Sequence, residues 1–384
     1  MSWPDVKLKD ICELAVDCVN KTAPFVEYET PYKMLRTTNV RGGFVDVDKV
    51  RYVTEETYEK WTRRSVPQKG DVILTREAPL GDVGRLTSDD NVFLGQRLFQ
   101  YRANPNKLDS LFLAYVLQSP LVQGRFKSRG FGATVQHAKV GDCENLEIPF
   151  PELSIQKKIG GILAEYDDLI ENNRRRIQLL EESARLLYRE WFVQLRFPGH
   201  EHVKIVDGVP EGWAHLTVGT LLGKIKRKGK VKKDDYKADG VLACVDQSKE
   251  FIGGYIDSTE LAIVDELPIL VFGDHTRVVK YIDFPFAPGA DGTQLLIPKS
   301  NEIPRVFFYF LIAGINLANA FYARHFKFLK ATEVLVPKKE LMRLFEDSVS
   351  TNMNQISLLR EQNKKLSKAR DILLPRLMNG TLTV

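Results

Sequence analysis

The chain of 384 residues repeats itself, and this repeat limits its possible folds more than any other sequence feature. Four stretches recur in the same order in the two halves, with apolar residues in matching places. A chance similarity would not preserve that order, so we interpret residues 1–150 and 198–336 as two homologous modules. The matching stretches are Trp3–Ile11 with Trp213–Leu221, Gly42–Asp46 with Gly253–Asp257, Leu108–Val116 with Ile303–Leu311, and His137 before Pro151 with His325 before Pro337.

Each module is predicted to mix helices and strands. Short β-branched or aromatic runs lie between Gly, Pro and Asp residues, as is typical of strands. Residues 108–117 and 303–312 have the i, i+3, i+4 apolar spacing of helices. The strands do not alternate regularly with helices, so we predict an α+β class and not a doubly wound sheet. The runs expected as strands include Phe44–Val47, Asp71–Leu74 and Ile269–Phe272.

A long spacer helix is predicted after each module, a central one at 151–197 and a distal one at 337–384. Apolar positions in both segments follow steps of four and three residues, the 3.5-residue period of a coiled-coil seam. Two such helices pair most economically with each other, and the module order makes the pair antiparallel. The seam positions are Ile159, Leu163, Tyr166, Ile170, Asn173, Ile177, Leu180, Ala184, Leu187 and Trp191, then Met342, Phe345, Val349, Asn352, Ile356, Leu359, Asn363, Leu366, Arg370 and Leu373. Pro375 is expected to end or kink the second helix.

Asn173 and Asn352 fall at the same seam position when Gln178 is aligned with Ser357. An asparagine in a seam lowers stability but fixes register and partner choice, so we predict this role for both residues. The alternative is that both amides are solvated where the helices separate.

The composition limits which cellular compartment and which kinds of binding site are expected for the chain. The four cysteines have no CxxC spacing and no nearby histidine pair, so we expect neither a disulfide framework nor structural zinc. The longest apolar run, Phe307–Ala313, is too short to span a bilayer, and no signal peptide is recognisable. We therefore expect a soluble, cytoplasmic protein. The net charge of +5 is only mildly basic, so the places where cations cluster matter more than their sum.

A search for catalytic motifs finds none that is complete. Gly219–Lys224 imitates a P-loop but is one residue short and lacks the Ser or Thr that would hold magnesium. His200 and His202 could contact a metal, but a solvated linker explains them better. There is no GxSxG, HExxH or strand-borne GxGxxG motif, and no adenine methyltransferase motif. We therefore expect a non-catalytic chain that binds neither a metal nor a cofactor.

Residues suited to nucleic acid form several clusters. Sequence recognition needs cations for phosphates and planar polar groups for base edges. The basic run Lys224–Lys233 fits phosphate contact, although a mobile, solvated loop is an equal alternative. The stretch Arg324–Lys330 alternates basic and aromatic residues and is interpreted as a strand. The candidate DNA-binding residues are Arg36, Thr37, Asn39, Arg41, Arg76, Gln96, Arg97, His137, Lys139, Lys226, Arg227, Lys228, Lys230, Gln247, Lys249, His275, Arg277, Arg324, His325 and Lys327.

The arrangement resembles the specificity subunits of type I restriction–modification enzymes. The stretches that carry the resemblance are Ile148–Leu153 with Gln156–Ile159, Ile177–Glu181, Pro210–Trp213 and Leu374–Gly380. It implies two target recognition domains, each reading one half of a split DNA target, with the helices setting the gap. It also implies two methyltransferase subunits as partners, with or without restriction subunits. S-adenosylmethionine, ATP and magnesium would then be bound by those partners.

A second hypothesis treats the chain as a coiled-coil adaptor whose two modules bind proteins. The basic and amide-bearing stretches favour DNA over protein partners. An autonomous methylase or nuclease is disfavoured because the motifs it needs are missing.

Overall fold

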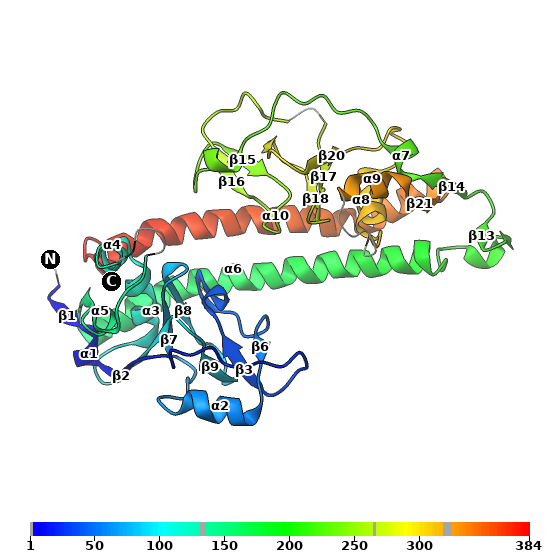
Figure 1. Cartoon of the computed structure of the whole chain (residues 1–384). Helices are drawn as coiled ribbons and strands as arrows, with labels where there is room; N and C mark the ends of the chain where they lie inside the picture. The colour runs from blue at the N-terminus through cyan, green and yellow to red at the C-terminus, as the bar shows by residue number, and fades with distance from the viewer. Residues whose placement is uncertain (1–2, 131, 133–135, 264–265, 318–323) are drawn as a thin grey trace. The chain divides into compact units, whose positions relative to one another are not determined.

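A computed structural model describes residues 3–130, 132, 136–263, 266–317 and 324–384 (Figure 1). The chain divides into a first unit, residues 1–172 with 362–384, and a second unit, residues 173–361. Two long helices, α6 (Leu153–Tyr188) and α10 (Lys339–Met378), contribute residues to both units. Each compact unit therefore contains part of both long helices.

The first unit is built on a six-stranded sheet in the order β2-β10-β7-β8-β5-β4, with a three-stranded sheet β6-β3-β9 and the pair β1-β11. The strands are β1 (Asp5–Lys7), β2 (Cys12–Asp17), β3 (Tyr32–Leu35), β4 (Val40–Arg41), β5 (Gly43–Val45), β6 (Arg51–Tyr52), β7 (Val72–Arg76), β8 (Leu80–Arg85), β9 (Asn91–Leu94), β10 (Leu98–Ala103) and β11 (Glu147–Pro149). The short helices are α1 (Leu8–Ile11), α2 (Glu55–Thr62), α3 (Ser110–Gln118), α4 (Pro120–Lys127) and α5 (Val140–Glu144).

The second unit contains two three-stranded sheets, β16-β15-β19 and β18-β17-β20, and the pairs β12-β13 and β14-β21. The strands are β12 (Ile205–Val206), β13 (Val209–Pro210), β14 (Ala214–Thr217), β15 (Leu242–Val245), β16 (Gly254–Ile256), β17 (Ile269–Gly273), β18 (Val279–Ile282), β19 (Phe286–Pro288), β20 (Thr293–Leu296) and β21 (Glu333–Val336). The helices are α7 (Val218–Leu221), α8 (Arg305–Ala313) and α9 (His325–Ala331), and a π-helical turn at Arg189–Val193 follows α6.

The two units share one strand topology. The first strand of each module pairs antiparallel with the last, β1 with β11 and β14 with β21. The central strand lies between two antiparallel neighbours, β7 between β8 and β10 as β17 lies between β18 and β20. A parallel pair completes both, β3 with β9 and β15 with β19. The predicted α+β class with two similar modules is confirmed.

One of the four sequence matches does not correspond to equivalent strands. Gly43–Val45 forms β5, which pairs with β4 and β8. Gly254–Ile256 forms β16, which pairs with β15 and so takes the place that β6 has in the first unit. This part of the sequence alignment is wrong, because similar side chains do not determine which strand a short segment pairs with.

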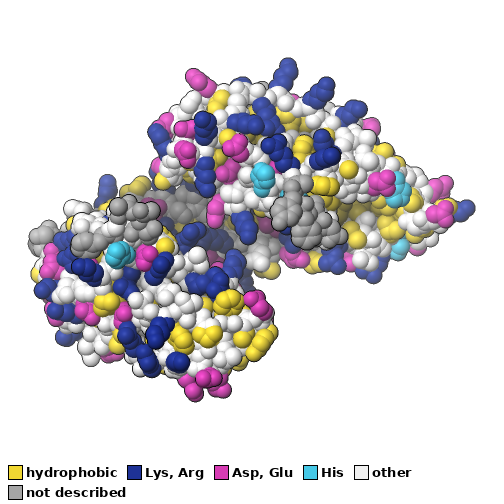
Figure 2. Space-filling view, in the orientation of Figure 1, with side chains coloured by type: hydrophobic (Ala, Val, Ile, Leu, Met, Phe, Trp, Pro, Cys, Tyr) yellow, Lys and Arg dark blue, Asp and Glu magenta, His cyan; other side chains and the backbone are white. Residues whose placement is uncertain are grey.

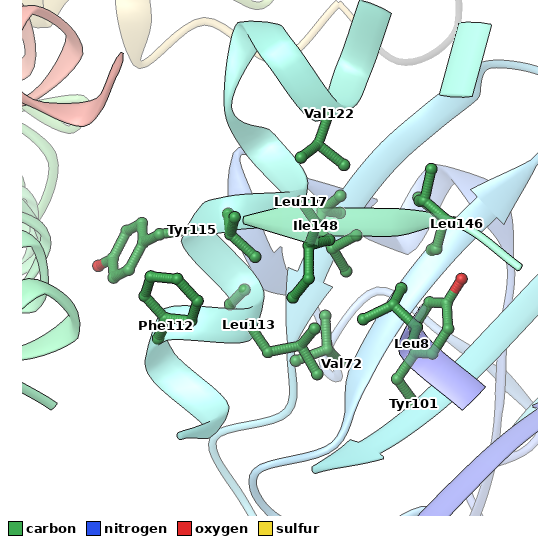
Figure 3. Close-up of a cluster of buried hydrophobic side chains, with 14 of the residues drawn as sticks. Leu8, Val72, Tyr101, Phe112, Leu113, Tyr115, Leu117, Val122, Leu146 and Ile148 are labelled. Carbon is green, nitrogen blue, oxygen red and sulfur yellow. The ribbon is translucent and has the colours of Figure 1, made fainter. Parts of the chain in front are cut away.

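The core of the first unit forms where α3 packs its apolar side chains on the central sheet (Figure 3). Phe112, Leu113 and Leu117 of α3 are buried against strand residues such as Val72. The helix begins at Ser110 because the Asp109 carboxylate accepts the Phe112 N–H at 2.9 Å. The predicted helices at 108–117 and 303–312 are confirmed as α3 and α8.

The two long helices pair antiparallel in the first unit. The Asn363 side-chain N–H donates to the Ile170 carbonyl at 3.3 Å, and Arg370 forms an ion pair with Asp167. Positions in α6 decrease from 170 to 167 while their partners in α10 increase from 363 to 370, so the helices run in opposite directions.

The second unit repeats this pairing. Arg360 Nη2 donates to Glu181 Oε1 at 2.6 Å, and the ring of Trp191 lies 6.0 Å from that of Phe345. Every predicted seam position in both helices is buried or half-buried, as an apolar seam requires.

The structure shows the surroundings of the seam asparagines and of Pro375. Asn173 is only 7% exposed and Asn352 is half-buried, so Asn173 is not a solvated amide. Pro375 does not end the helix, since α10 continues to Met378 and the Asn379 N–H donates to the Pro375 carbonyl at 3.1 Å. The prolyl ring lies in the last turn of α10, and it removes only the one backbone hydrogen bond that residue 375 would donate.

Candidate nucleic-acid interface

The first unit joins three distant segments just beyond its central strand. Arg76, the last residue of β7, donates its backbone N–H to the Arg97 carbonyl at 2.8 Å. Its carbonyl accepts the Ala138 N–H at 2.9 Å. We call this meeting point of residues 76–77, 96–97 and 137–139 the first junction.

The second unit forms the same junction with other residues. Asp274, directly after β17, donates its N–H to the Gly292 carbonyl at 2.7 Å and accepts the His325 N–H at 3.0 Å. We call this the second junction. The pairing registers of the central strands show that Asp274 occupies the place of Arg76, and His325 that of Ala138.

The first junction gathers several of the predicted DNA-binding residues. Arg76 Nη1 donates to the Ala138 carbonyl at 3.2 Å, and its buried Nε has no hydrogen-bond partner among the described residues. Arg97 pairs with Glu77 at 3.0 Å but keeps half of its side chain exposed. The exposed residues at this rim are Gln96, Arg97, His137 and Lys139.

The loop after β3 lies next to this junction. The Gly95 N–H donates to the Leu35 carbonyl at 2.8 Å, which places Arg36 beside Gln96. Arg36 and Thr37 are half-buried and Arg41 is exposed. Asn39 is buried, its Oδ1 accepts the Arg36 N–H at 2.9 Å and its Nδ2 donates to the Lys49 carbonyl at 2.8 Å. The Asn39 amide therefore shapes the loop from inside, although we predicted that it reads a base.

Gln247 has a similar internal role at the second junction. Its Nε2 donates to the Asp291 carbonyl at 3.0 Å, and its Oε1 accepts the His275 N–H at 3.1 Å. This amide thus connects the loop after β15 with the turns after β17 and before β20. His275 and Arg277 are exposed on the connected turn, and Lys249 is exposed on the loop after β15.

Lys280 holds the same loop, the one after β15, from the interior of the unit. Its ammonium, only 5% exposed on β18, donates to the Asp246 carbonyl at 2.8 Å and to the Glu250 carbonyl. Burial lowers the pKa of Lys280 to about 8, although the neighbouring Asp246 and Glu250 oppose this shift. Sequence analysis missed Lys280, because a single lysine in an apolar strand gives no sign of its partners.

The stretch Arg324–Lys330 is helical, which corrects its interpretation as a strand. His325 begins α9, and Phe326 packs its ring against Phe272 at 6.2 Å. Arg324 and Lys327 are exposed, whereas His325 is half-buried and its Nδ1 has no hydrogen-bond partner among the described residues. The alternation of basic and aromatic residues does not reflect a strand here. The helix buries Leu329 and part of Phe326 on one side and leaves its lysines exposed.

The predicted basic run lies on an extended segment between α7 and β15. Lys226, Lys228 and Lys230 are exposed. Arg227 is half-buried, its Nη1 donates to the Thr293 carbonyl at 3.3 Å, and burial lowers its pKa. Sequence analysis omitted Lys224 and Lys232 from the candidates, although the period-two spacing of these lysines could have indicated an extended segment.

The described residues show neither a metal-binding cluster nor a membrane-spanning helix. No group of three or more His, Cys, Asp or Glu side chains there is arranged to hold a metal ion. Within the same residues, no helix combines the length and apolar character needed to cross a membrane.

Comparisons with known proteins agree with this architecture. A family model described as the type I restriction modification DNA specificity domain matches residues 2–182. The MjaIX specificity subunit of Methanocaldococcus jannaschii is 24% identical over 87% of this chain and 82% of its own length. The putative MjaX specificity subunit of the same organism is 23% identical over 100% and 94%. The crystal structure of the type I S subunit from M. genitalium shares the fold, with a TM-score of 0.55 and 21% identity over 98% of this chain and 96% of that one.

Two similar modules and two long helices, together with the matched specificity domain, define a DNA sequence-recognition protein. Residues 2–182 belong to the family of type I restriction modification DNA specificity domains, and the chain is similar to type I specificity subunits over most of its length. Specificity subunits are the non-catalytic members of that family.

Proposed function

We propose that this chain reads a bipartite DNA target, with one half-site recognised at each junction. The supporting observation is that one backbone arrangement carries different side chains in the two units. The position of Arg76 is taken by Asp274, and the position of Ala138 by His325. The Asp274 carboxylate itself is buried and accepts the Phe326 N–H at 2.7 Å, so exposed neighbours face the solvent at this junction. These are His275, Arg277 and Lys327, where the first junction exposes Gln96, Arg97 and His137. Because the two sets of donors and acceptors differ, the two junctions suit different base pairs.

We also propose that the chain docks two methyltransferase subunits along its helices. In the second unit, Leu179 and Leu186 of α6 and Leu344 and Leu358 of α10 are exposed, Leu179 by 61% and Leu358 by 59%. All four lie two positions after a seam residue, so the leucines of one helix lie on the same side of it. Leu179 and Leu186 are one heptad apart and form an apolar line, whereas Thr351 interrupts the line between Leu344 and Leu358. Exposed apolar lines of this kind suit contact with another protein. S-adenosylmethionine, ATP and magnesium would be bound by methyltransferase and restriction subunits, and this chain would bind none of them.

The experiment is selection of bound sequences from random duplex DNA by the chain in complex with its methyltransferase subunits. We expect two enriched blocks separated by a gap of fixed length. Arg76→Ala with Arg97→Ala should relax one block only, because both residues belong to the first junction. Arg63→Ala, which removes an exposed arginine elsewhere in the same unit, should leave both blocks unchanged.

Absence of any enriched sequence would reject the proposal. Binding of proteins without DNA enrichment would favour the adaptor hypothesis instead.

A further inference from the structure

Five lysines form a row on one side of an extended segment in the second unit. Between α7 and β15, Lys224, Lys226, Lys228, Lys230 and Lys232 are all exposed. The residues between them, from Ile225 to Val231, are half-buried or buried. Alternate residues of an extended chain point to opposite sides, so the five ammonium groups share one side at intervals of roughly 6.6 Å. We call these five residues the lysine row.

The backbone that carries the lysine row is fixed to the unit. The Gly223 N–H donates to the Ile297 carbonyl at 2.8 Å, and Val231 exchanges hydrogen bonds with Pro288 and Ala290. A side chain at Gly229 would come within 2.7 Å of Leu261, so the segment lies close to the surface beneath it. The alternative of a freely solvated loop, which sequence analysis left open, does not fit these contacts.

The lysine row runs beside the second junction. Arg227, in the middle of the segment, bonds to the carbonyl of Thr293, which directly follows Gly292 of that junction. At the far end, the Ala290 N–H donates to the Val231 carbonyl at 2.6 Å. Residues 290–293 therefore connect the row with the place where we propose that bases are read. Figure 2 shows Lys and Arg side chains gathered along the edge of this unit where the segment runs in Figure 1.

No ion pair between a lysine of the row and a carboxylate is found in the described part of the chain. Like charges at this spacing repel one another by about 0.6 kcal/mol per neighbouring pair in water. The row thus opposes folding slightly and contributes nothing to the core. A polyanion with regularly spaced charges would remove this cost.

The first unit has no such row at the equivalent place. Cys12 lies opposite Ala103 as Leu222 lies opposite Pro298, so β2 corresponds to the start of the lysine segment. β2 has the sequence Cys-Glu-Leu-Ala-Val-Asp, which contains two carboxylates, Glu13 and Asp17, and no lysine. The two modules share a fold but differ in charge along this edge.

We propose that the lysine row is a track for the phosphates of duplex DNA, and that it makes the second module the salt-sensitive anchor of the complex. This inference rests on the proposed function. It adds that the two modules contribute unequally to the affinity for DNA. Eight residues of extended chain span about 26 Å, which corresponds to roughly eight base pairs at 3.4 Å each. Contacts with phosphates carry no sequence information, so the row supplies affinity and the junction supplies selectivity.

The test measures how binding to DNA depends on salt, with the chain in complex with its methyltransferase subunits. Lys226→Gln, Lys228→Gln and Lys230→Gln are combined in a row variant. Lys7→Gln, Lys9→Gln and Lys69→Gln, all exposed in the first unit, are combined in a control variant with the same change in net charge. The probes are the full target, a duplex that keeps only one half-site, and a scrambled duplex.

The slope of log K against log[salt] is negative, and we expect the row variant to make it shallower by about 2.7. Each lost phosphate contact removes about 0.9 from its magnitude. This loss should appear with the full target, with the second half-site alone and with the scrambled duplex. The sequence preference should stay unchanged, and the control variant should keep the slope of the native chain.

Two other outcomes separate the inference from the proposed function. If the native complex prefers its target and the row variant keeps the full slope, the track is rejected and the specificity function stands. If the native complex shows no sequence preference, the specificity function is rejected, and the slope on scrambled DNA still decides whether the row contacts phosphates.

Discussion

At the scale of single residues, Asp167 joins three elements of the first unit. It is 6% exposed on α6, accepts the Tyr115 hydroxyl of α3 at 2.6 Å and forms an ion pair with Arg370 of α10. Tyr115 points away from the rest of its cluster (Figure 3). Burial and the bond to Asp167 raise the pKa of Tyr115 far above its usual value, so this hydroxyl remains a donor. One carboxylate thus connects the module to both helices.

Replacement of Asp167 should destabilise the protein strongly. Asp167→Ala leaves the Arg370 guanidinium and the Tyr115 hydroxyl without their buried acceptor, which typically costs about 3 kcal/mol. Asp168→Ala removes the exposed carboxylate next to it and should cost less than about 0.5 kcal/mol. Urea unfolding of the full chain measures both free energies. Equal effects of the two variants would mean that the buried contacts do not stabilise the unit.

Lys280 should make stability depend on pH in alkaline solution. Its pKa is lowered to about 8 in the folded chain from 10.5 in the unfolded chain, so the unfolded chain binds this proton more tightly. Stability from this group therefore rises as the pH increases from about 8 to 10.5. The full interval corresponds to roughly 3 kcal/mol at 1.36 kcal/mol per pH unit.

The measurement compares urea unfolding of the native chain and of Lys280→Met at several values between pH 7 and pH 10.5. Burial raises the pKa of Tyr281, a neighbour on β18, which gives the opposite dependence, so only the difference between the two proteins is informative. We expect the native chain to gain stability relative to the variant as the pH rises. A difference that stays constant across this range would contradict the lowered pKa.

At the scale of secondary-structure elements, local periodicity predicted the long helices well and the contacts of loops poorly. The seam positions are buried because a 3.5-residue period places them on one side of a helix whatever the rest of the chain does. Asn39 and Gln247 were predicted to face DNA, but their amides bond to backbone groups ten and 44 residues away. Such distant partners are determined by the fold of the whole unit, and the neighbouring sequence holds no signal of them.

The helix pair should act as a spacer between the half-sites. A seven-residue insertion in each helix, copied from its own seam at residues 171–177 and 360–366, keeps the same face inward. It adds about 10 Å, which should lengthen the gap in the target by about three base pairs at 3.4 Å each. Sequence selection from random duplexes measures the gap. An unchanged gap would reject the spacer role.

A single insertion, in α6 alone, is the matched control for this experiment. It adds the same residues but shifts one seam against the other, so that equivalent levels such as Glu181 and Arg360 no longer meet. We expect this variant to lose binding to the full target. Only the double insertion should restore binding with a new gap.

At the scale of the whole molecule, the chain is one topology used twice with different surfaces. Both units place the end of the central strand against two distant segments, yet only the second adds a row of lysines beside it. The shared strands bury apolar residues and define the fold, so they tolerate few changes. Exposed side chains around each junction, such as Arg97 and His275, and those along the edge of each unit can differ without loss of the core. Selectivity can therefore change in one unit while the helices remain the same.

Exchange of residues 1–150 for the corresponding module of another specificity subunit should change one half of the target only. The first junction lies entirely within these residues, whereas the second junction and the lysine row lie outside them. Residues such as Tyr115 that contact the helices should be retained in the chimera, because Asp167 would otherwise lose its donor. Methylation mapping in cells that express the chimera with its methyltransferase subunits identifies both half-sites. Since the lysine row is untouched, the salt dependence of binding to scrambled DNA should equal that of the native complex. Changes in both half-sites would show that the modules do not act independently.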